Sequence, residues 1–172
     1  MEYYDLIRSR ETLRNYESER KVPEEILNRV LEAGRLAPSA SNRQPWTFVL
    51  VSSEKVLREV TASYQRPWFQ DAPHVLVVIG DKTKSWVRPY DGYNSIETDL
   101  AIAMDHMILA AENEGVGACW IIAFDYEKLA AALDISDNEV VYCMAALGYP
   151  KAGYQKKGNK IRKPLEEIVR RI

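Results

Sequence analysis

Three segments of the sequence collect side chains that suit an anion and a polar organic ligand. They are Arg8–Tyr16, where two arginines flank a threonine, the Ser-Ala-Ser-Asn-Arg run at 39–43, and the basic stretch Lys160–Lys163. Arginine binds phosphate bidentately, and hydroxyl and amide groups hydrogen-bond to ribityl or ring oxygens. Each segment alone is more typical of a turn or a solvated surface. Together they predict a site for a phosphorylated, hydroxylated, planar ligand.

Cysteine and histidine chemistry is less well supported. Cys119 and Cys143 each lie in an apolar run, and His74 and His106 are the only histidines. No cluster has metal-ligand spacing, so we predict no metal site. Buried, reduced thiols are the expected state, because free cysteine behaves as a small hydrophobe. A Cys-His nucleophile pair stays open but is disfavoured.

Length and composition indicate one globular domain over residues 1–172, with 47% hydrophobic residues. The net charge of −2, with both signs interspersed, argues against a nucleic-acid binder that relies on bulk charge. The first residues lack an apolar signal core, and no run approaches the roughly 20 apolar residues of a membrane span. We expect a soluble, cytoplasmic protein with no membrane partner.

The elements that must position these segments follow from hydrophobic periodicity. Helices are predicted at 22–34, 54–62, 95–114 and 125–133, and strands at 46–51, 73–79, 118–123 and 140–147. The strands are almost wholly apolar, which indicates a sheet covered on both faces. Residues 82–94 read as a loop or flap. Ile161, Leu165, Ile168 and Val169 are too apolar for a free tail, so the C-terminal segment should pack on this chain or on a second subunit.

Five motifs in this order resemble the nitroreductase family of FMN-dependent oxidoreductases. They are RETLRNY (10–16), APSASNRQPW (37–46), GVGACWI (115–121), ALGYP (146–150) and KIRKPLEE (160–167). The Pro-Ser-x-x-Asn-x-Gln-Pro-Trp block is the most specific of them. The resemblance implies an α+β, nitroreductase-like fold with a central, mainly antiparallel sheet flanked by helices. It also implies an intertwined homodimer with FMN sites at the interface.

The resemblance assigns roles to individual residues. Arg10, Lys160 and Arg162 would hold the FMN phosphate, Thr12 would contact the ribityl chain, and Arg14 would lie beside the N1 and O2 edge of the ring. The other subunit would supply the turn formed by Pro38, Ser39, Ala40 and Asn42. Further contacts would come from the Gln65 amide and from the backbone of Ile121, Ile122 and Ala123. Glu11 stands where the family usually has Arg or His, so it would contribute only through its backbone.

The function that the resemblance implies is transfer of reducing equivalents from NAD(P)H to nitroaromatic, quinone or related small-molecule acceptors, by a ping-pong mechanism. No catalytic side chain is required, because stacking and geometry suffice for hydride transfer. A narrower flavin chemistry, dehalogenation or enone reduction, is an alternative, with Arg66, Arg88 and Tyr90 as candidate substrate anchors. A flavin-binding redox sensor with little turnover is another alternative, and a non-flavin α+β dimer is the third. The sequence has no G-x-G-x-x-G dinucleotide fingerprint after a strand.

Overall fold

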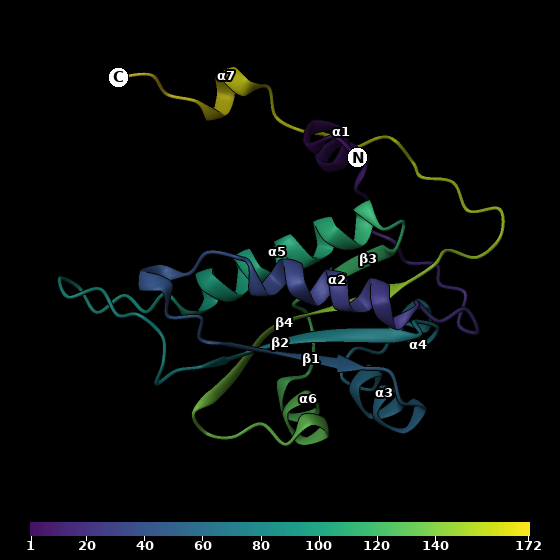
Figure 1. The fold of residues 1–172 in the computed structure, drawn as a ribbon, viewed down its shortest axis with the longest axis horizontal. Helices are drawn as coiled ribbons and strands as arrows, with labels where there is room; N and C mark the ends of the chain where they lie inside the picture. Colours follow the sequence, from purple (N-terminus) through teal and green to yellow (C-terminus); the bar gives the residue numbers. More distant parts are fainter.

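One four-stranded sheet forms the centre of the protein (Figure 1), which we describe over residues 1–172 from a computed structural model. The strands are β1 (Trp46–Val51), β2 (His74–Asp81), β3 (Gly117–Ile121) and β4 (Glu139–Gly148), in the spatial order β1-β2-β4-β3. Every neighbouring pair is antiparallel. The predicted α+β class with a mainly antiparallel sheet is therefore confirmed.

Helices occupy most of the remaining chain. They are α1 (Tyr3–Ser9), α2 (Glu24–Arg35), the short 3-10 helix η1 (Ala40–Asn42), α3 (Glu54–Thr61), α4 (Pro67–Gln70), α5 (Ile96–Asn113), α6 (Tyr126–Leu133) and α7 (Leu165–Ile168). The four predicted helices and the four predicted strands are all present, with small shifts at their ends. Helices α1, η1, α4 and α7 were not predicted. Helices α1 and α7 bury no residue and so show no apolar stripe, and η1 and α4 span only three and four residues. None of the helices combines the length and the apolar character that crossing a bilayer requires.

Two layers of helices cover the two faces of the sheet. Leu76 and Val78 of β2 pack in one core cluster with α2 and α5, whereas Val75 and Val77 pack in a second cluster with α3, α4 and α6. Neighbouring side chains of a strand point to opposite faces, so a strand that is buried along its length serves both clusters. The prediction of a sheet covered on both faces is confirmed.

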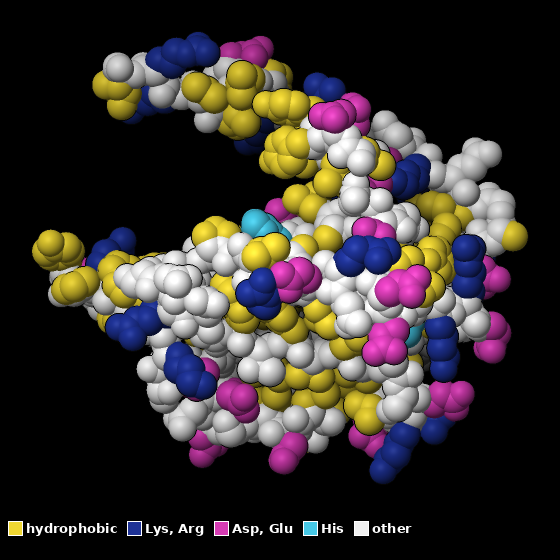
Figure 2. All heavy atoms as spheres, in the orientation of Figure 1, with side chains coloured by type: hydrophobic (Ala, Val, Ile, Leu, Met, Phe, Trp, Pro, Cys, Tyr) yellow, Lys and Arg dark blue, Asp and Glu magenta, His cyan; other side chains and the backbone are white.

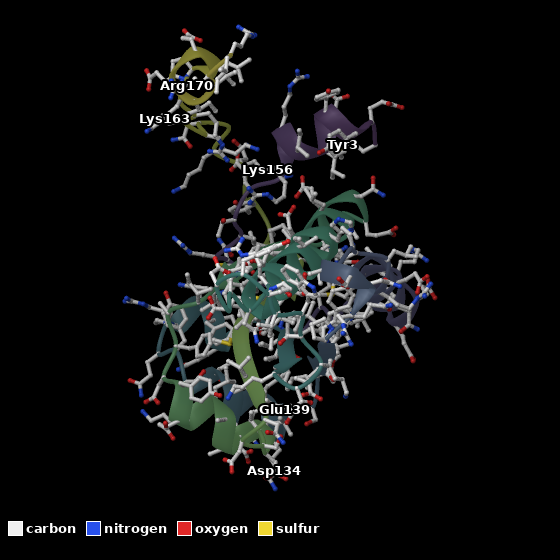
Figure 3. All side chains as sticks on the ribbon, turned by 90° about the vertical axis from the view of Figure 1, so that its left-hand side faces the viewer. Tyr3, Asp134, Glu139, Lys156, Lys163 and Arg170 are labelled. Carbon is white, nitrogen blue, oxygen red and sulfur yellow. The ribbon has the colours of Figure 1, made fainter.

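Residues 151–172, which we call the C-terminal arm, leave the body and extend beside α1. Figures 1 and 3 show α1 and the arm on the same side of the molecule, beyond α5, with Lys156 near the body and Lys163 and Arg170 further out. In the arm, Ile161 is 91% exposed and Leu165 is 63% exposed. Packing of these side chains on their own chain is therefore ruled out. Their burial on a second subunit stays a prediction.

Candidate functional site

A cavity of about 460 Å³ brings the first and the last predicted motifs together. Its walls come from residues 10–15 and from the arm. The lining residues are Arg10, Glu11, Thr12, Arg14, Asn15, Tyr154, Lys157, Asn159, Lys160 and Arg162. We call it the cation cavity, because five of its ten lining side chains are lysine or arginine. Six of the predicted site residues thus meet in one place, although their role as cofactor ligands stays a prediction.

The positive charges of this cavity have no acidic partners. Ten ion pairs occur in the protein, and none of them involves a lysine or arginine of the cation cavity. Partial burial and the neighbouring charges of Arg10 and Arg162 lower the pKa of Lys160, more than the acids Glu11 and Glu112 raise it. Like charges held together without counterions are typical of an anion site.

The backbone of the arginine segment is attached to the edge of the sheet. Thr12 pairs in parallel with Ala118 of β3, and the Leu13 N–H donates to the Ala118 carbonyl at 2.9 Å. The hydroxyl of Tyr16, a fully buried residue, donates to the carbonyl of Leu13 (2.9 Å) or Ala146 (3.1 Å). Leu13 lies in the core, so the alternate residues Thr12 and Arg14 face outward. Pairing with the edge strand β3 therefore fixes the positions of the outward-facing side chains Thr12 and Arg14.

One polar atom of the cation cavity lacks a partner. Asn15 Oδ1 is buried and accepts no hydrogen bond within the protein. Buried acceptors are rarely left unpaired, because the loss of hydration is not compensated.

Further along the same edge, two more predicted segments come together. The Asp125 N–H donates to the Ser63 carbonyl at 2.8 Å, which joins the chain before Gln65 to the chain after Ala123. The Arg14 guanidinium carbon lies 5.8 Å from the centre of the Trp68 ring. Of the predicted backbone contacts, Ile122 is 65% exposed and thus accessible to a ligand.

The loop of residues 38–44 is held in an unusual conformation. Ser41, Asn42 and Gln44 have φ angles of 50°, 52° and 49°, a region that side chains other than glycine seldom adopt. The Ser39 hydroxyl accepts a hydrogen bond from the Gln44 N–H at 2.9 Å. The Asp99 side chain, which is almost fully buried, accepts a bond from the Ala40 N–H at 2.8 Å. These bonds preorganise a loop whose polar groups face outward.

The 38–44 loop and the cation cavity lie at opposite ends of α5. Asp99, near the start of the helix, holds Ala40, whereas Glu112, near its end, accepts a bond from the Ser9 hydroxyl at 3.0 Å. At 1.5 Å per residue these two anchors are about 20 Å apart along the helix axis. A single chain therefore does not bring the two predicted halves of the site together.

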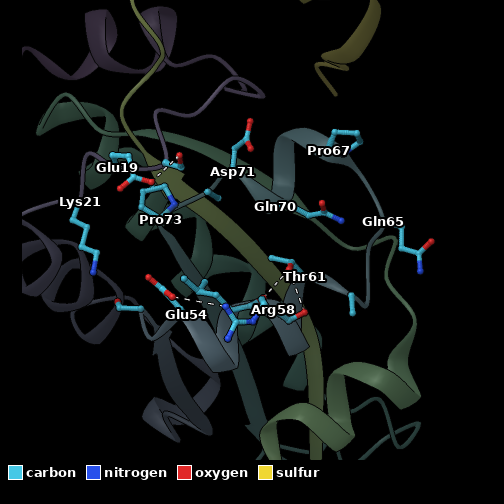
Figure 4. Close-up of a pocket in the computed structure, with 15 residues that line it drawn as sticks. Glu19, Lys21, Glu54, Arg58, Thr61, Gln65, Pro67, Gln70, Asp71 and Pro73 are labelled. Atoms are coloured by element: carbon cyan, nitrogen blue, oxygen red, sulfur yellow. Dashed lines mark hydrogen bonds and ion pairs between the residues drawn. The ribbon is translucent and has the colours of Figure 1, made fainter.

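A larger cavity lies elsewhere and has a different character. It measures about 720 Å³, and Gln65 is the only predicted site residue in its wall (Figure 4). Its charged groups carry both signs, and several are paired: Arg58 with Glu54 at 3.8 Å, and Asp71 with Lys151 of the arm at 2.7 Å. Paired charges favour a solvated groove over an anion site.

Nucleophilic cysteine chemistry finds no support in the geometry. Cys119 and Cys143 are both buried and unpaired, as expected. Burial raises the pKa of each thiol, and for Cys119 it outweighs the opposing effect of Arg14. Both side chains therefore stay protonated and packed in the core.

The sequence interpretation missed several members of the site. Asn15, Tyr154, Lys157 and Asn159 line the cation cavity, and Asp99 anchors the 38–44 loop. Asp99 offered one signal, an acid placed within the apolar face of a long helix. The others lie in segments without periodicity, so nothing in their spacing indicates where their side chains point.

Comparison with known proteins gives a consistent result. A model of the nitroreductase family matches residues 7–66 and 56–149. A protein of Archaeoglobus fulgidus, provisionally named an NADH dehydrogenase/NAD(P)H nitroreductase, is 32% identical over 151 residues, or 85% of this chain and 84% of that protein. The crystal structure of a nitroreductase family protein from Clostridium difficile 630 is 31% identical, with a TM-score of 0.91 and coverage of 99% and 98%. An FMN-dependent nitroreductase from Clostridium difficile R20291 shares the fold at a TM-score of 0.79, with 24% identity and 96% of each chain covered. This chain belongs to the nitroreductase family.

Proposed function

We propose that the protein is an FMN-dependent oxidoreductase that passes reducing equivalents from NAD(P)H to nitroaromatic, quinone or related acceptors. The observation that carries the proposal is the cation cavity, where lysines and arginines gather without acidic partners. A phosphate group would supply the missing negative charge. FMN, when bound, supplies the hydride-accepting and hydride-donating ring that neither this chain's side chains nor its backbone provides.

The residues present fit FMN at both of its polar parts. Arg10, Lys160 and Arg162 suit the phosphate, because their charges converge on one cavity without counterions. The exposed Thr12 hydroxyl suits a neighbouring chain of hydroxyl groups. The sequence has no second phosphate-binding glycine loop, which favours FMN over a dinucleotide flavin.

Arg14 and the end of β3 would orient the ring. Arg14 is exposed and has no carboxylate partner, so its charge is available to stabilise the additional negative charge of a reduced ring. The backbone after Ile121 offers N–H and C=O groups that can orient the ring without placing a competing proton donor beside it. In this arrangement the chain binds, orients and balances charge, and no side chain acts as acid or base.

The proposal includes a twofold dimer in which the 38–44 loop completes the partner's site. The separation of the loop from the cation cavity along α5 supports this exchange. The exposed apolar side chains of the arm also support it, and Figure 2 shows hydrophobic side chains on the arm, which stands clear of the body. These exposed residues are Ile161, Leu165, Ile168, Val169 and Ile172. Deletion of residues 160–172 should therefore abolish the dimer and flavin binding together, as measured by light scattering with flavin absorbance. A truncated monomer that keeps stoichiometric FMN would contradict the shared site.

Two measurements test the catalytic proposal. Chromatography of the released cofactor should identify FMN, and oxidation of NADH or NADPH should accelerate when a quinone or a nitroaromatic compound is added. Initial rates at several concentrations of both substrates should give parallel double-reciprocal lines, as a ping-pong mechanism requires. Bound flavin without turnover would favour the redox sensor, and a chain that binds no flavin after reconstitution would refute the proposal.

The narrower dehalogenation chemistry has weaker support. Of its candidate anchors, Arg88 already donates to both carboxylate oxygens of Asp91, at 2.7 and 2.6 Å. Tyr90 is 94% exposed, within the 82–94 loop. The third anchor, Arg66, has its guanidinium carbon 5.6 Å from the centre of the Tyr64 ring. We therefore use a halogenated phenol only as one further acceptor in the assay.

A further inference from the structure

The Glu11 side chain bonds to the backbone of the arm and not to the cations around it. It is the only acid in the wall of the cation cavity, yet it forms no ion pair with any of the five cations there. Instead, its Oε2 accepts a hydrogen bond from the Lys157 N–H at 2.9 Å, and its Oε1 accepts one from the Gly158 N–H at 2.7 Å. Both oxygens are thus committed to the backbone of the arm.

Both N–H groups donate to the same carboxylate. Gly158 has a φ of +64°, and successive N–H groups beside a residue in this conformation can point into one concavity. Concavities of this kind bind phosphate and carboxylate groups. Here the anion is supplied from within the chain, by the residue that follows Arg10.

These bonds are the main backbone attachment of this part of the arm. Residues 154–164 form no helix or strand. From Gln155 to Lys163, the only backbone N–H groups with hydrogen bonds are those of Lys157 and Gly158, and both bond to Glu11. Lys160 follows two positions later, and its ammonium donates to the carbonyls of Ile7 (3.0 Å) and Arg10 (2.9 Å). The Lys156 ammonium also holds the arm, through the Ser9 carbonyl at 3.1 Å and the Glu112 carboxylate. The Glu11 carboxylate therefore fixes the backbone of the arm between Lys156 and its phosphate-suited cations.

We propose that Glu11 is a positioning residue that clasps the C-terminal arm, so that Lys160 and Arg162 are held opposite Arg10 before the cofactor arrives. This inference rests on the proposed binding of FMN phosphate in the cation cavity. It adds to that function by assigning a role to the Glu11 side chain, whose negative charge would otherwise only repel the phosphate. Preorganisation of this kind improves affinity because binding does not have to order a flexible segment.

The clasp and a purely electrostatic role predict opposite changes in FMN affinity when Glu11 is replaced by a neutral residue. If Glu11 acts only through its charge, replacing it by a neutral residue raises the net positive charge of the cavity and tightens FMN binding. If it clasps the arm, the same replacement loosens the backbone that carries Lys160 and Arg162 and weakens FMN binding, by about tenfold. Riboflavin lacks the phosphate, so loss of the clasp should change its affinity much less.

The experiment compares the full-length protein with Glu11→Gln and Glu11→Ala, using Glu17→Gln as a control that removes the same charge from an exposed position of the same segment. Flavin fluorescence titrations give the affinities for FMN and riboflavin, and limited trypsin digestion of the flavin-free proteins gives the cleavage rate at Lys156–Lys163. Far-UV circular dichroism and light scattering establish that fold and oligomeric state are unchanged. The clasp predicts that in both Glu11 variants the arm is cleaved faster than in the wild type and the ratio of FMN to riboflavin affinity is lower. The Glu17 control should match the wild type in both respects.

Tighter FMN binding with an unchanged cleavage rate would overturn the clasp and leave a purely electrostatic role. Unchanged affinity and cleavage would overturn it as well. If even the wild-type chain binds no FMN, the proposed function fails, but the trypsin digestion still decides whether Glu11 holds the arm. Glu11→Gln keeps the size and polarity of the side chain, so it remains informative where the alanine variant does not fold.

Discussion

Asp99→Ala should release the 38–44 loop from the body of the protein. Asp99 lies in the first turn of α5 with 2% of its surface exposed, and its two oxygens accept bonds from the Ala40 N–H and the Ser95 hydroxyl, each at 2.8 Å. Alanine removes both acceptors and leaves the Ser95 hydroxyl without its partner in the core. The Ala40 N–H, by contrast, is partly buried and can recover a bond to water.

The structure sets the magnitude of this effect. A hydrogen bond to a charged group contributes roughly 1.5–3 kcal/mol. The three non-glycine residues with positive φ in the loop store strain of about 1 kcal/mol each, or about 3 kcal/mol in total. Because the Asp99 to Ala40 bond and the strain are of similar size, the loop should open when the bond is lost. The free energy of unfolding should fall by about 2–3 kcal/mol, since opening the loop relieves part of the strain.

Urea unfolding at one fixed protein concentration measures the loss, and hydrogen exchange at the Ala40 amide reports the opening of the loop. Asp137→Ala, at an exposed position, is the matched control and should change stability by less than about 0.5 kcal/mol. If Asp99→Ala is as stable as the control and the Ala40 amide keeps its protection, Asp99 does not hold the loop. The reasoning on strain would then be wrong as well.

Three further predictions concern the cation cavity and the core. Arg10→Ala and Arg162→Ala should each weaken FMN binding about ten- to a hundredfold with the fold retained, since one charge-assisted bond contributes roughly 1.5–3 kcal/mol. FMN titrations at fixed salt measure this effect. If neither variant changes the affinity, the phosphate assignment is wrong. Gly117→Ala should lower both the melting temperature and the FMN affinity, because its new Cβ would lie 2.2 Å from Leu13 Cδ2 and displace the arginine segment; an unchanged affinity would show that this segment tolerates the shift. Burial lowers the pKa of His74, and the charge of Lys21 is a smaller cause in the same direction. The unfolded chain therefore takes up a proton more readily than the folded one. The free energy of unfolding should be constant above about pH 6.5 and fall below it. Urea midpoints between pH 5 and 8 should show this slope, and a His74→Gln variant that keeps it would assign it to another group.

The local bonds of His74 explain why it stays neutral in the fold. The Val22 N–H donates to Nε2 at 3.0 Å, so Nε2 carries no proton and Nδ1 donates to the Ser52 hydroxyl at 2.7 Å. Protonation of Nε2 would remove the acceptor for a buried N–H. The same tautomer argues against Ser52 as a nucleophile, because His74 donates to it and cannot accept its proton.

The sequence alone determined the elements of this fold and the kinds of side chain in its site. The strand at 74–81 is recognisable because eight consecutive residues are mostly apolar, and the α5 stripe is recognisable because its apolar residues recur at helical spacing. Both patterns reflect contacts within a few residues, which periodicity records directly. The arginine segment and the basic arm were also predictable as anion-suited, since their side-chain types carry that chemistry in any surroundings.

Only the tertiary structure decided which of these groups meet. Lys160 bonds to the carbonyl of Arg10 across 150 positions of sequence, and no local pattern encodes that contact. The same applies to Glu11, which was expected to contribute only through its backbone, whereas its carboxylate bonds to the backbone of the arm. Asp99 and Glu112 hold different parts of the predicted site at the two ends of α5, because packing of the helix across the sheet sets where each anchor lies. Local physics therefore determines the elements, whereas the site depends on how the whole core brings them together.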